Sequence, residues 1–513
     1  MSKQIYNPYM PSFEYVPDGE PHLFGDRIYL YGSHDRFDGA EYCLNDYVCY
    51  SADVKDLTDW RYEGVIYRKE QDPRNQNIPA DTPPNQPRFG VEVKDENSLN
   101  PPGIHAMWAP DVVKGLDGRY YLYYCLDYLP EIAVAVCDTP AGKYEFLGLV
   151  KHEDGVPLGN REGDLKQFDP GIFIDDDRTI YLYSGNAPRL KEQYDPKKGS
   201  QVMMLCEDML TLAAEPRHLM PDIYEAEGTE YDGHAFFEAS SIRKINGTYY
   251  FVYSSIQSHE LCYAVSDRPD EGYRYGGTLV DIGDIFLNGR TADNPLNCLG
   301  NTHGGIECAN GQWYVFYHRQ TNRTNFSRQA CAEKIYFDED GRIAQAEVTS
   351  CGLNKGPLRG SGTYPANIAC QLNRHGRQVY SQPSEMEEKF PYLTQDMADC
   401  EPDPELIRMD RELPVQYIKN IRDGSVIGYK YFEFEGADRI SVKVRGKAQG
   451  SFTVAADAPE NVVGSIPIKI DSGEWMTVSG ETEVIGGVHA LYFEFKGDGC
   501  LDFVTFTLQS SIK

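Results

Sequence analysis

A short strand-like phrase recurs five times between residues 25 and 318, and this repetition restricts the possible folds more than any other feature. Its copies read GDRIYLYGS at 25–33, DGRYYLYYC at 117–125, DDRTIYLYS at 176–184, NGTYYFVYS at 246–254 and NGQWYVFYH at 310–318. Each copy begins with residues that favour a turn, in most of them Asp or Asn beside Gly. Each continues as a run of β-branched and aromatic residues, which is typical of a buried β-strand.

The intervals between the copies indicate how the strands are grouped. Measured from the first residue of each run, the copies are separated by 92, 60, 69 and 64 residues. Repeats of this length in an all-β chain predict four-stranded propeller blades. We therefore expect a five-bladed β-propeller over residues 1–345. The long first interval contains the Pro- and Asn-rich residues 68–103, which we expect to form a loop or lid walling one side of a pocket.

The repeating strand pattern of the sequence ends at about residue 345. Residues 346–400 contain scattered Gly and Pro without a strand pattern, and they predict an irregular connecting segment. Over residues 401–513 short alternating strands return, as in GYKYFEFEG at 428–436, which is typical of a β-sandwich. The predicted fold class is therefore all-β, a five-bladed propeller followed by a sandwich.

Composition limits the partners and the compartment. The 79 acidic and 49 basic residues give a net charge of −30, which would repel nucleic acids and anionic membranes and suits a neutral substrate. The 13 cysteines are scattered, several of them in apolar runs, and form no C-x-x-C pair, which indicates free thiols in a reducing compartment. The N-terminus lacks the features of a signal peptide. We expect a cytoplasmic protein, with no expectation for its oligomeric state.

An ionisable residue stands ten or eleven positions before the strand run in four of the five copies. These residues are Asp18, Asp169, Glu238 and His303, while the second copy has the sequence WAPD at 108–111 in the same window. Equivalent positions of a propeller are related by rotation about its axis, so we expect these side chains to converge at one end of the channel. Three carboxyls in one cavity with apolar neighbours would have separated pKa values, which acid and base roles require.

Five motifs around these positions resemble glycoside hydrolase family 43. They are PDGEPHLFGDRIYLYGSHD at 17–35, WAPDVV at 108–113, FDPGIFIDDD at 168–177, FFEASSIRKINGTYYFVYS at 236–254 and THGGIECANGQWYVFYHR at 302–319. The resemblance covers roughly residues 5–345 and implies an inverting hydrolase with Asp18 as general base and Glu238 as general acid. It implies that Asp169 orients the acid and modulates its pKa. Because Asp18 is followed by Gly and not by the Pro that the family often has, Glu20 remains an alternative base.

The same resemblance suggests residues that bind the substrate or a metal. His303 resembles the family's axial histidine, which lies near a water-coordinated calcium ion; otherwise it is a buried histidine that holds a backbone carbonyl. Histidine alone is a poor ligand for a hard cation, so calcium would rely on waters and other oxygens. Arg328 resembles the arginine that reaches the sugar hydroxyls, with a surface arginine as the alternative. Trp108 either stacks on a sugar or belongs to the core, and His34 either lines the pocket or is structural.

The C-terminal segment resembles carbohydrate-binding module family 6 through residues 428–436 and 488–497. Trp475 is the only tryptophan in this segment, and no aromatic platform for a glycan is evident. We expect this domain to buttress the propeller rather than to bind glycan.

Three functional hypotheses follow. The first is an exo-acting hydrolase that releases pentose from arabinose- or xylose-containing oligosaccharides, with α-L-arabinofuranosidase favoured over β-xylosidase and no organic cofactor. The second is a non-catalytic glycan-binding propeller, which predicts the loss of at least one acid from the repeat. The third is a retaining fructan-type hydrolase, because Glu307-Cys308 resembles a pair of glycoside hydrolase family 32, although that family's Trp-Met-Asn-Asp-Pro motif is missing.

Overall fold

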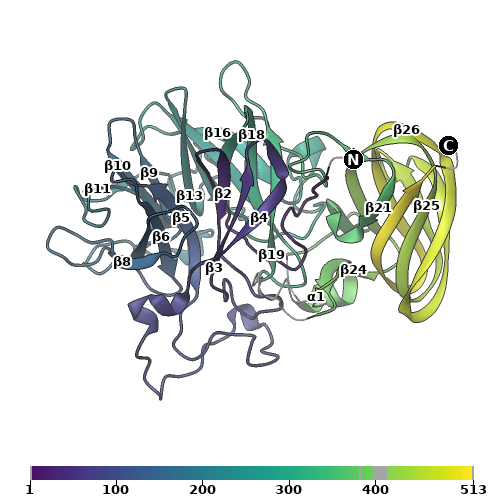
Figure 1. The fold of residues 1–513 in the computed structure, drawn as a ribbon, viewed down its shortest axis with the longest axis horizontal. Coiled ribbons are helices and arrows are strands. Elements are labelled where there is room, and N and C mark those ends of the chain that lie inside the picture. The colour runs from purple at the N-terminus through teal and green to yellow at the C-terminus, as the bar shows by residue number, and fades with distance from the viewer. Residues whose placement is uncertain (1–2, 381–382, 398–412, 511–513) are drawn as a thin grey trace.

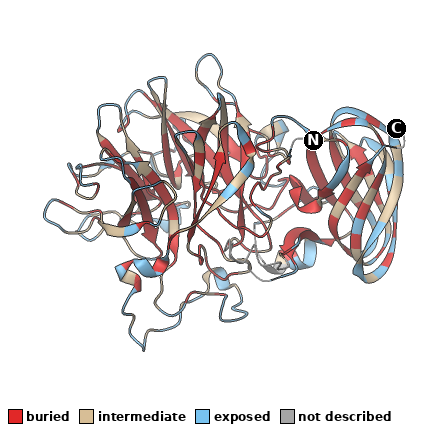
Figure 2. Cartoon of the chain, viewed as in Figure 1, coloured by how far each residue is buried: buried red, intermediate tan, exposed pale blue. Residues whose placement is uncertain are grey.

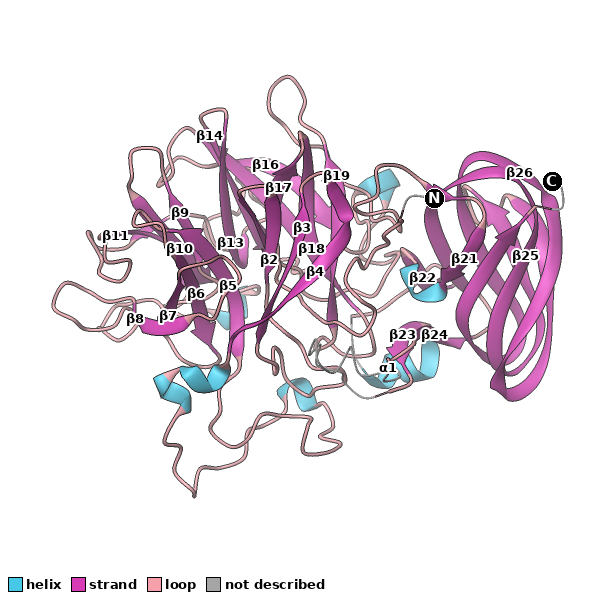
Figure 3. Ribbon diagram, viewed as in Figure 1, coloured by secondary structure: helices cyan, strands magenta, loops and turns pink. Residues whose placement is uncertain are grey.

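The computed structural model describes residues 3–380, 383–397 and 413–510. Two all-β units lie side by side, a propeller formed by the N-terminal part and a curled sheet drawn in yellow at the C-terminal end (Figure 1). Strands dominate both units, and the helices are short pieces in the connections (Figure 3). Within the described residues no helix is both long and apolar enough to cross a bilayer.

Five antiparallel sheets of consecutive strands form the propeller, as the repeat predicts. The first contains β1 (Glu20–Phe24), β2 (Arg27–Tyr31), β3 (Tyr47–Asp53) and β4 (Asp56–Tyr67). The second contains β5 (Met107–Lys114), β6 (Tyr120–Leu126), β7 (Ile132–Cys137) and β8 (Glu145–Leu149). The third contains β9 (Gly171–Ile174), β10 (Ile180–Asn186), β11 (Gly199–Leu205) and β12 (Arg217–His218).

The remaining two sheets complete the ring. The fourth contains β13 (Phe236–Ile245), β14 (Thr248–Ser255), β15 (Glu260–Ser266) and β16 (Arg274–Asp281). The fifth has three strands, β17 (Ile306–Ala309), β18 (Gln312–Gln320) and β19 (Arg328–Ile335). The N-terminal segment runs beside β19, where the amide of Tyr9 donates to the carbonyl of Ala330 at 3.1 Å. This contact ties the start of the chain to the last sheet and closes the circle.

The repeated phrase is the second strand of each sheet, and its side chains alternate between two neighbouring sheets. In β6, for example, Leu122 and Tyr124 pack toward the first sheet, while Tyr121 and Tyr123 pack toward the third. The same arrangement produces a separate apolar core between every pair of adjacent sheets, including the fifth and the first. The first strands contact one another from sheet to sheet, β17 with β1, β1 with β5, β5 with β9 and β9 with β13. They therefore lie innermost, around the axis.

Short 3₁₀ turns mark the connections between these strands. Three of them occupy the long loop between β4 and β5: η1 (Lys69–Gln71), η2 (Pro73–Asn75) and η3 (Arg88–Gly90). The others are η4 (Lys191–Gln193), η5 (Leu287–Gly289) and η6 (Ala366–Ile368). The long loop has no strand, as its composition predicts.

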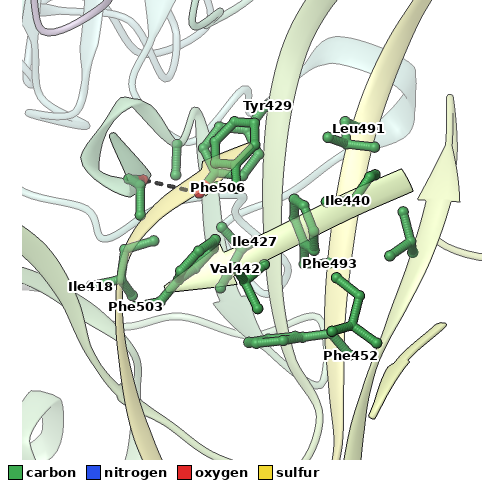
Figure 4. Close-up of a cluster of buried hydrophobic side chains, with 14 of the residues drawn as sticks. Ile418, Ile427, Tyr429, Ile440, Val442, Phe452, Leu491, Phe493, Phe503 and Phe506 are labelled. Atoms are coloured by element: carbon green, nitrogen blue, oxygen red, sulfur yellow. Dashed lines mark hydrogen bonds between the residues drawn. The ribbon is translucent and has the colours of Figure 1, made fainter. Parts of the chain in front are cut away.

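The C-terminal unit is one seven-stranded sheet that curls around its own core. Its strands are β20 (Leu358–Arg359), β21 (Gly362–Pro365), β22 (Gln371–Arg374), β23 (Tyr392–Gln395), β24 (Gln416–Ile421), β25 (Ser425–Ala456) and β26 (Val462–Gln509). Ile440 of β25 lies opposite two residues of β26, Leu508 and Gly480, so the long strands fold back on each other. The aromatic side chains of Phe452, Phe493, Phe503 and Phe506 gather inside this curl (Figure 4).

Residues 346–400 do not form the irregular connection that we predicted. The segment contains β20, β21, β22, β23 and the helix α1 (Pro383–Lys389), and the strands pair within the C-terminal sheet. Leu358, for example, lies opposite Phe432, and Tyr364 lies opposite Phe506. Strands of two to four residues are too short to show a recognisable alternation, which explains the error. The predicted boundary between residues 400 and 401 lies outside the described residues.

The two units share several polar contacts. Tyr15 of the propeller donates its hydroxyl to Gln395 Oε1 at 2.7 Å, and Gln416 Nε2 donates to Gln329 Oε1 at 2.9 Å. The ammonium of Lys430 from β25 reaches Glu347 at 2.7 Å and Asp284 at 3.4 Å. Buried residues fill the sheets of both units, and exposed residues lie on the loops and outer strands (Figure 2).

Candidate active site

A cavity of about 210 Å³ is lined by residues from all five sheets of the propeller. Each repeat contributes the residue at its equivalent position: Asp18, Trp108, Asp169, Glu238 and His303. Residues far apart in the sequence therefore line one cavity, because they occupy equivalent positions around the propeller axis. The structure places the three acids and the histidine together, as the repeat predicts.

The backbone is strained at two of these positions and directly after two others. Asp18, Ala109, Asp169 and Ala239 have positive φ angles of 56°, 22°, 45° and 72°. Non-glycine residues rarely adopt this region, and holding one there costs on the order of 1–3 kcal/mol. Register shifts between Trp108 and Asp111 in β5, and around Glu238 in β13, add β-bulges at two of the positions. Bulges and left-handed residues redirect side chains, and here the side chains beside them line the cavity.

Asp18 is held in its ionised form by a guanidinium. Arg328 Nη1 donates to Asp18 Oδ1 at 2.9 Å, and the other nitrogens of the same guanidinium donate to both oxygens of Asp35 at 2.9 Å. Burial is the largest single effect and raises the pKa of Asp18, but Arg328 and, to smaller extents, His318, His303 and Ser33 together lower the pKa below its ordinary value. A carboxylate that stays ionised is suited to accept a proton from water.

A neutral imidazole supports Asp18 from the other side. The backbone amide of Asp18 donates to His318 Nδ1 at 3.0 Å, and His318 Nε2 donates to the carbonyl of Asn301 at 2.9 Å. Burial lowers the pKa of His318 to about 3, so this ring is neutral with its proton on Nε2. Because the histidine is neutral at pH 7, Arg328 supplies the positive charge at this carboxylate.

Glu238 and Asp169 have the opposite electrostatic environment. Burial, followed by the charge of Asp18, raises the pKa of Glu238 to about 7. The side-chain amide of Asn186 donates to Glu238 Oε2 at 3.1 Å. Burial, followed by the charges of Glu238 and Asp18, raises the pKa of Asp169 well above its ordinary value, and the amide of Ala239 donates to Asp169 Oδ2 at 3.2 Å. The cavity therefore holds one carboxyl whose pKa is lowered beside two carboxyls whose pKa values are raised.

His303 lies close to two of these acids. Its Nδ1 is 3.6 Å from Asp169 Oδ2 and 4.0 Å from Asp18 Oδ1, and burial lowers its pKa to about 4. Both of those oxygens already accept hydrogen bonds, from Ala239 and Arg328. Among the described residues, His303 belongs to neither of the two side-chain groups with metal-binding geometry. Calcium prefers six to eight oxygen ligands, so a calcium ion at His303 remains a prediction that this geometry does not support.

Two acids that the sequence left open as alternatives lie outside the cavity lining. Glu20 Oε1 accepts a hydrogen bond from Ser241 at 2.8 Å and pairs with Arg243 at 2.9 Å, so the alternative base is turned toward β13. Glu307 faces the same arginine, at 3.6 Å. Neither Glu20 nor Glu307 therefore contributes a carboxyl to the cavity lining.

The three residues that we predicted to bind substrate differ in where the structure places them. Trp108 lines the cavity, with its ring 5.2 Å from that of Phe168, and its Nε1 has no hydrogen-bond partner among the described residues. Arg328 also lines the cavity, but it is 2% exposed and its contacts are with Asp18 and Asp35. His34 does not line the cavity, which favours the structural alternative. Its Nε2 pairs with Glu14 at 2.7 Å and its Nδ1 bonds the carbonyl of Asp46 at 2.8 Å, so the buried ring is structural.

Sequence reasoning missed several residues that line the cavity. They are Tyr42, Arg88, Phe89, Arg189, Phe237 and Tyr380. Arg88 and Phe89 come from the long loop, which confirms that this loop forms one wall. Tyr380 comes from the segment that joins the C-terminal sheet, and its hydroxyl donates to the carbonyl of Gln257 at 2.9 Å. Most of these residues lie in connections between strands, where the repeat carries no signal.

Comparison with known proteins agrees with this geometry. The family model described as "Glycosyl hydrolases family 43" matches residues 16–343, a range that includes the strands of all five propeller sheets. The xylosidase/arabinosidase of Thermoclostridium stercorarium is 46% identical over 511 residues, which cover 99% of each chain.

Two further relatives are more distant. Xylosidase/arabinosidase 43A of Humicola insolens is 29% identical over 360 residues, covering 64% of this chain and 96% of its own. The solved structure of a family 43 arabinoxylan arabinofuranohydrolase from Bacillus subtilis, in complex with cellotetraose, aligns with 98% of this chain and 96% of its own. Its TM-score is 0.48 at 20% sequence identity. The family model itself covers the propeller part of the chain.

Proposed function

Because the chain belongs to glycosyl hydrolase family 43, we propose that it is an inverting, exo-acting glycosidase that releases single pentoses from arabinose- or xylose-containing oligosaccharides. One observation carries the proposal: Asp18 and Glu238 share a cavity, with the pKa of one below and of the other above its ordinary value. Two carboxyls with opposite protonation are what acid–base hydrolysis of a glycosidic bond requires. The names of the relatives cover both arabinosidase and xylosidase activity.

In the proposed reaction each group in the cavity has one task. Asp18 accepts a proton from a water molecule whose oxygen attacks the anomeric carbon. The bond from that carbon to the glycosidic oxygen breaks, and Glu238 gives its proton to the leaving oxygen. Arg328 keeps Asp18 ionised, and burial together with the negative charge of Asp18 keeps Glu238 protonated. The role of Asp169 in orienting the acid and modulating its pKa is part of the proposal. The products are a free pentose of inverted anomeric configuration and the shortened oligosaccharide.

The size of the cavity supports release of one sugar at a time. Its volume of about 210 Å³ lies below the range of about 300–1,000 Å³ that is usual for pockets of drug-sized ligands, which suits a single small ring. The loop residues Arg88 and Phe89 close one side, and Tyr380 closes another. α-L-Arabinofuranosidase remains the favoured activity and β-xylosidase the alternative.

Substitution of the acid tests this function. Glu238→Gln should lower kcat/KM for pentosides with poor leaving groups by about 10²–10⁴-fold, because general acid catalysis contributes that much. Pentosides with a dinitrophenyl leaving group, which needs little protonation, should lose far less. Glu192→Gln, an exposed residue of η4 outside the cavity, serves as the control and should leave kcat/KM unchanged. Full activity of Glu238→Gln on all substrates, or a first product of retained configuration by NMR, would refute the mechanism.

We further propose a reducing, cytoplasmic environment and a supporting role for the C-terminal unit. The twelve cysteines in the described part of the chain are free, which suits a compartment without disulfides. The contacts of Tyr15 with Gln395 and of Lys430 with Asp284 support a domain that buttresses the propeller. The resemblance of this unit to carbohydrate-binding module family 6 stays a prediction.

A further inference from the structure

A second and larger cavity adjoins the proposed active site on the side of the general acid. Its volume is about 610 Å³, and it shares Trp108, Arg189, Phe237 and Glu238 with the first cavity. Asp18 does not line it. In an inverting glycosidase the acid faces the leaving group and the base faces the opposite side of the sugar ring. The second cavity is therefore where the leaving part of the oligosaccharide would lie, an assignment that rests on the proposed function.

This cavity is basic although the whole chain is strongly acidic. Arg88, Lys166, Arg189 and Lys198 line it, and Glu238 is the only carboxylate among its described lining residues. The chain as a whole has 79 acidic against 49 basic residues. The cavity, with four cationic side chains and one carboxyl, therefore has the opposite charge balance to the chain as a whole. A cavity rich in positive charge attracts a negatively charged ligand.

Arg88 differs from the other three cations of this cavity, because it pairs with a carboxylate. Arg88 is neutralised by Glu41, whose Oε1 lies 2.8 Å from Arg88 Nε. Within the described part of the chain, Lys166, Arg189 and Lys198 have no carboxylate within ion-pair distance. The guanidinium of Arg189 instead donates to the carbonyls of Ile256 and Gln257 at 3.0 and 3.4 Å, which leaves its charge uncompensated.

The charges act directly on the reacting group. Burial raises the pKa of Glu238, and the positive charges of Arg189 and Lys198 oppose that rise. They are therefore close enough to the proposed general acid to influence a ligand bound against it. A negative group on the leaving side would pair with them.

We infer that the leaving group of the natural substrate carries a carboxylate, so that the enzyme removes pentose from oligosaccharides that contain a uronic acid next to the scissile bond. Lys166, Arg189 and Lys198, which line the cavity together with Glu238, would meet this carboxylate. This preference for a negatively charged leaving group would act in addition to the selection of the pentose by the first cavity.

Matched aryl pentosides test the inference. We would compare kcat/KM for 3-carboxyphenyl and 3-carbamoylphenyl pentosides, whose leaving phenols have similar acidity and shape but differ in charge. Partly exposed ion pairs are worth about 0.2–1 kcal/mol each, so wild-type enzyme should favour the carboxylate about fivefold at low salt. The preference should shrink toward unity at about 1 M salt, because screening is then complete within a few ångströms.

Two variants and one control test whether the preference for the carboxylate substrate arises from the lysines of this cavity. Lys198→Gln should at least halve the ratio of kcat/KM for carboxylate over carboxamide, and Lys166→Gln combined with it should bring the ratio close to one. Lys197→Gln, an exposed neighbour that does not line the cavity, should leave the ratio unchanged. Hydrolysis of the carboxamide reports whether each variant is folded.

The outcomes separate this inference from the proposed function. The carboxylate site would be refuted if wild-type enzyme had equal kcat/KM for the two substrates, or if the ratio were unchanged by both lysine substitutions. Neither result would contradict the proposed hydrolase function. Absence of hydrolysis with both compounds, as arabinofuranosides and as xylosides, would instead overturn the pentosidase function itself.

Discussion

At the scale of single residues, carboxyls at the same repeat position have pKa values shifted in opposite directions in different blades. Asp18 receives a hydrogen bond from the guanidinium of Arg328, whereas Glu238 receives one from the neutral amide of Asn186. A fixed positive charge lowers a carboxyl pKa, and burial with another carboxylate nearby raises it. The division between base and acid thus depends on which partner each blade supplies.

The pH dependence of kcat/KM should show this division. With Glu238 as the acid and a pKa of about 7, activity should fall as the pH rises through about 7, because the proton needed by the leaving oxygen is lost. With Asp18 as the base and a pKa below its ordinary value of 3.8, activity should persist down to about pH 4. Initial rates at substrate concentrations below KM measure the profile.

Glu238→Gln provides the check on that assignment. Its residual activity on activated pentosides should lack the alkaline limb, because the titrating group is gone. An alkaline limb that stays near pH 7 in this variant would mean that another group, for example Asp169, sets it.

At the scale of elements, connections rather than strands shape the mouth of the cavity. The loop between β4 and β5 places Phe89 at the rim, where its ring is 73% exposed and stacked on that of Phe326 at a centroid distance of 6.2 Å. Phe89 has a positive φ of 54°, an uncommon conformation for a bulky residue. An exposed aromatic ring held in a strained turn beside a pocket is suited to stack on a sugar.

Phe89→Ala should therefore weaken substrate binding without unfolding the protein. We expect KM for a pentose oligosaccharide to rise about two- to tenfold, because aromatic contacts are worth about 0.5–1.5 kcal/mol. Stability should change by less than about 0.5 kcal/mol, since the side chain is mostly exposed. Val93→Ala, an exposed residue of the same loop that does not line the cavity, is the control. An unchanged KM with Phe89→Ala would exclude the ring from substrate binding.

At the scale of the whole molecule, the C-terminal sheet is joined to the propeller by a buried charge. Lys430 is 5% exposed, and its ammonium lies between Glu347 and Asp284. Burial raises the pKa of Asp284 to about 6 even though Lys430 opposes the rise. Breaking a buried ion pair by removing one partner leaves the other charge without compensation in a low dielectric.

Lys430→Met should destabilise the protein by about 3–5 kcal/mol at pH 7, measured by chemical denaturation. Adding Asp284→Asn should restore much of that loss, because the uncompensated carboxylate is then removed. Lys447→Met, whose ammonium is exposed on β25, should cost less than about 1 kcal/mol. If the double variant were no more stable than Lys430→Met, packing of the lysine side chain and not its charge would join the two units.

Much of the fold and the centre of the site could be predicted because both depend on local pattern and symmetry. The turn-plus-strand phrase identifies the second strand of each blade, and five copies imply a closed ring. Since rotation relates equivalent positions, the convergence of Asp18, Asp169 and Glu238 followed without knowledge of any contact. The strands of residues 346–400 escaped prediction because their length, two to four residues, is below what alternation can reveal.

The amino-acid sequence alone determined the number of blades, the register of the polar residues and the loop that walls the cavity. Only the tertiary structure decided that Arg328 pairs with Asp18, that His34 is turned toward Glu14, and that Lys166 and Lys198 meet beside Glu238. Repetition and alternation are properties of the chain itself, so they can be read directly from it. A pKa or a cavity charge depends on which distant side chains become neighbours, and that is known only once the chain has folded.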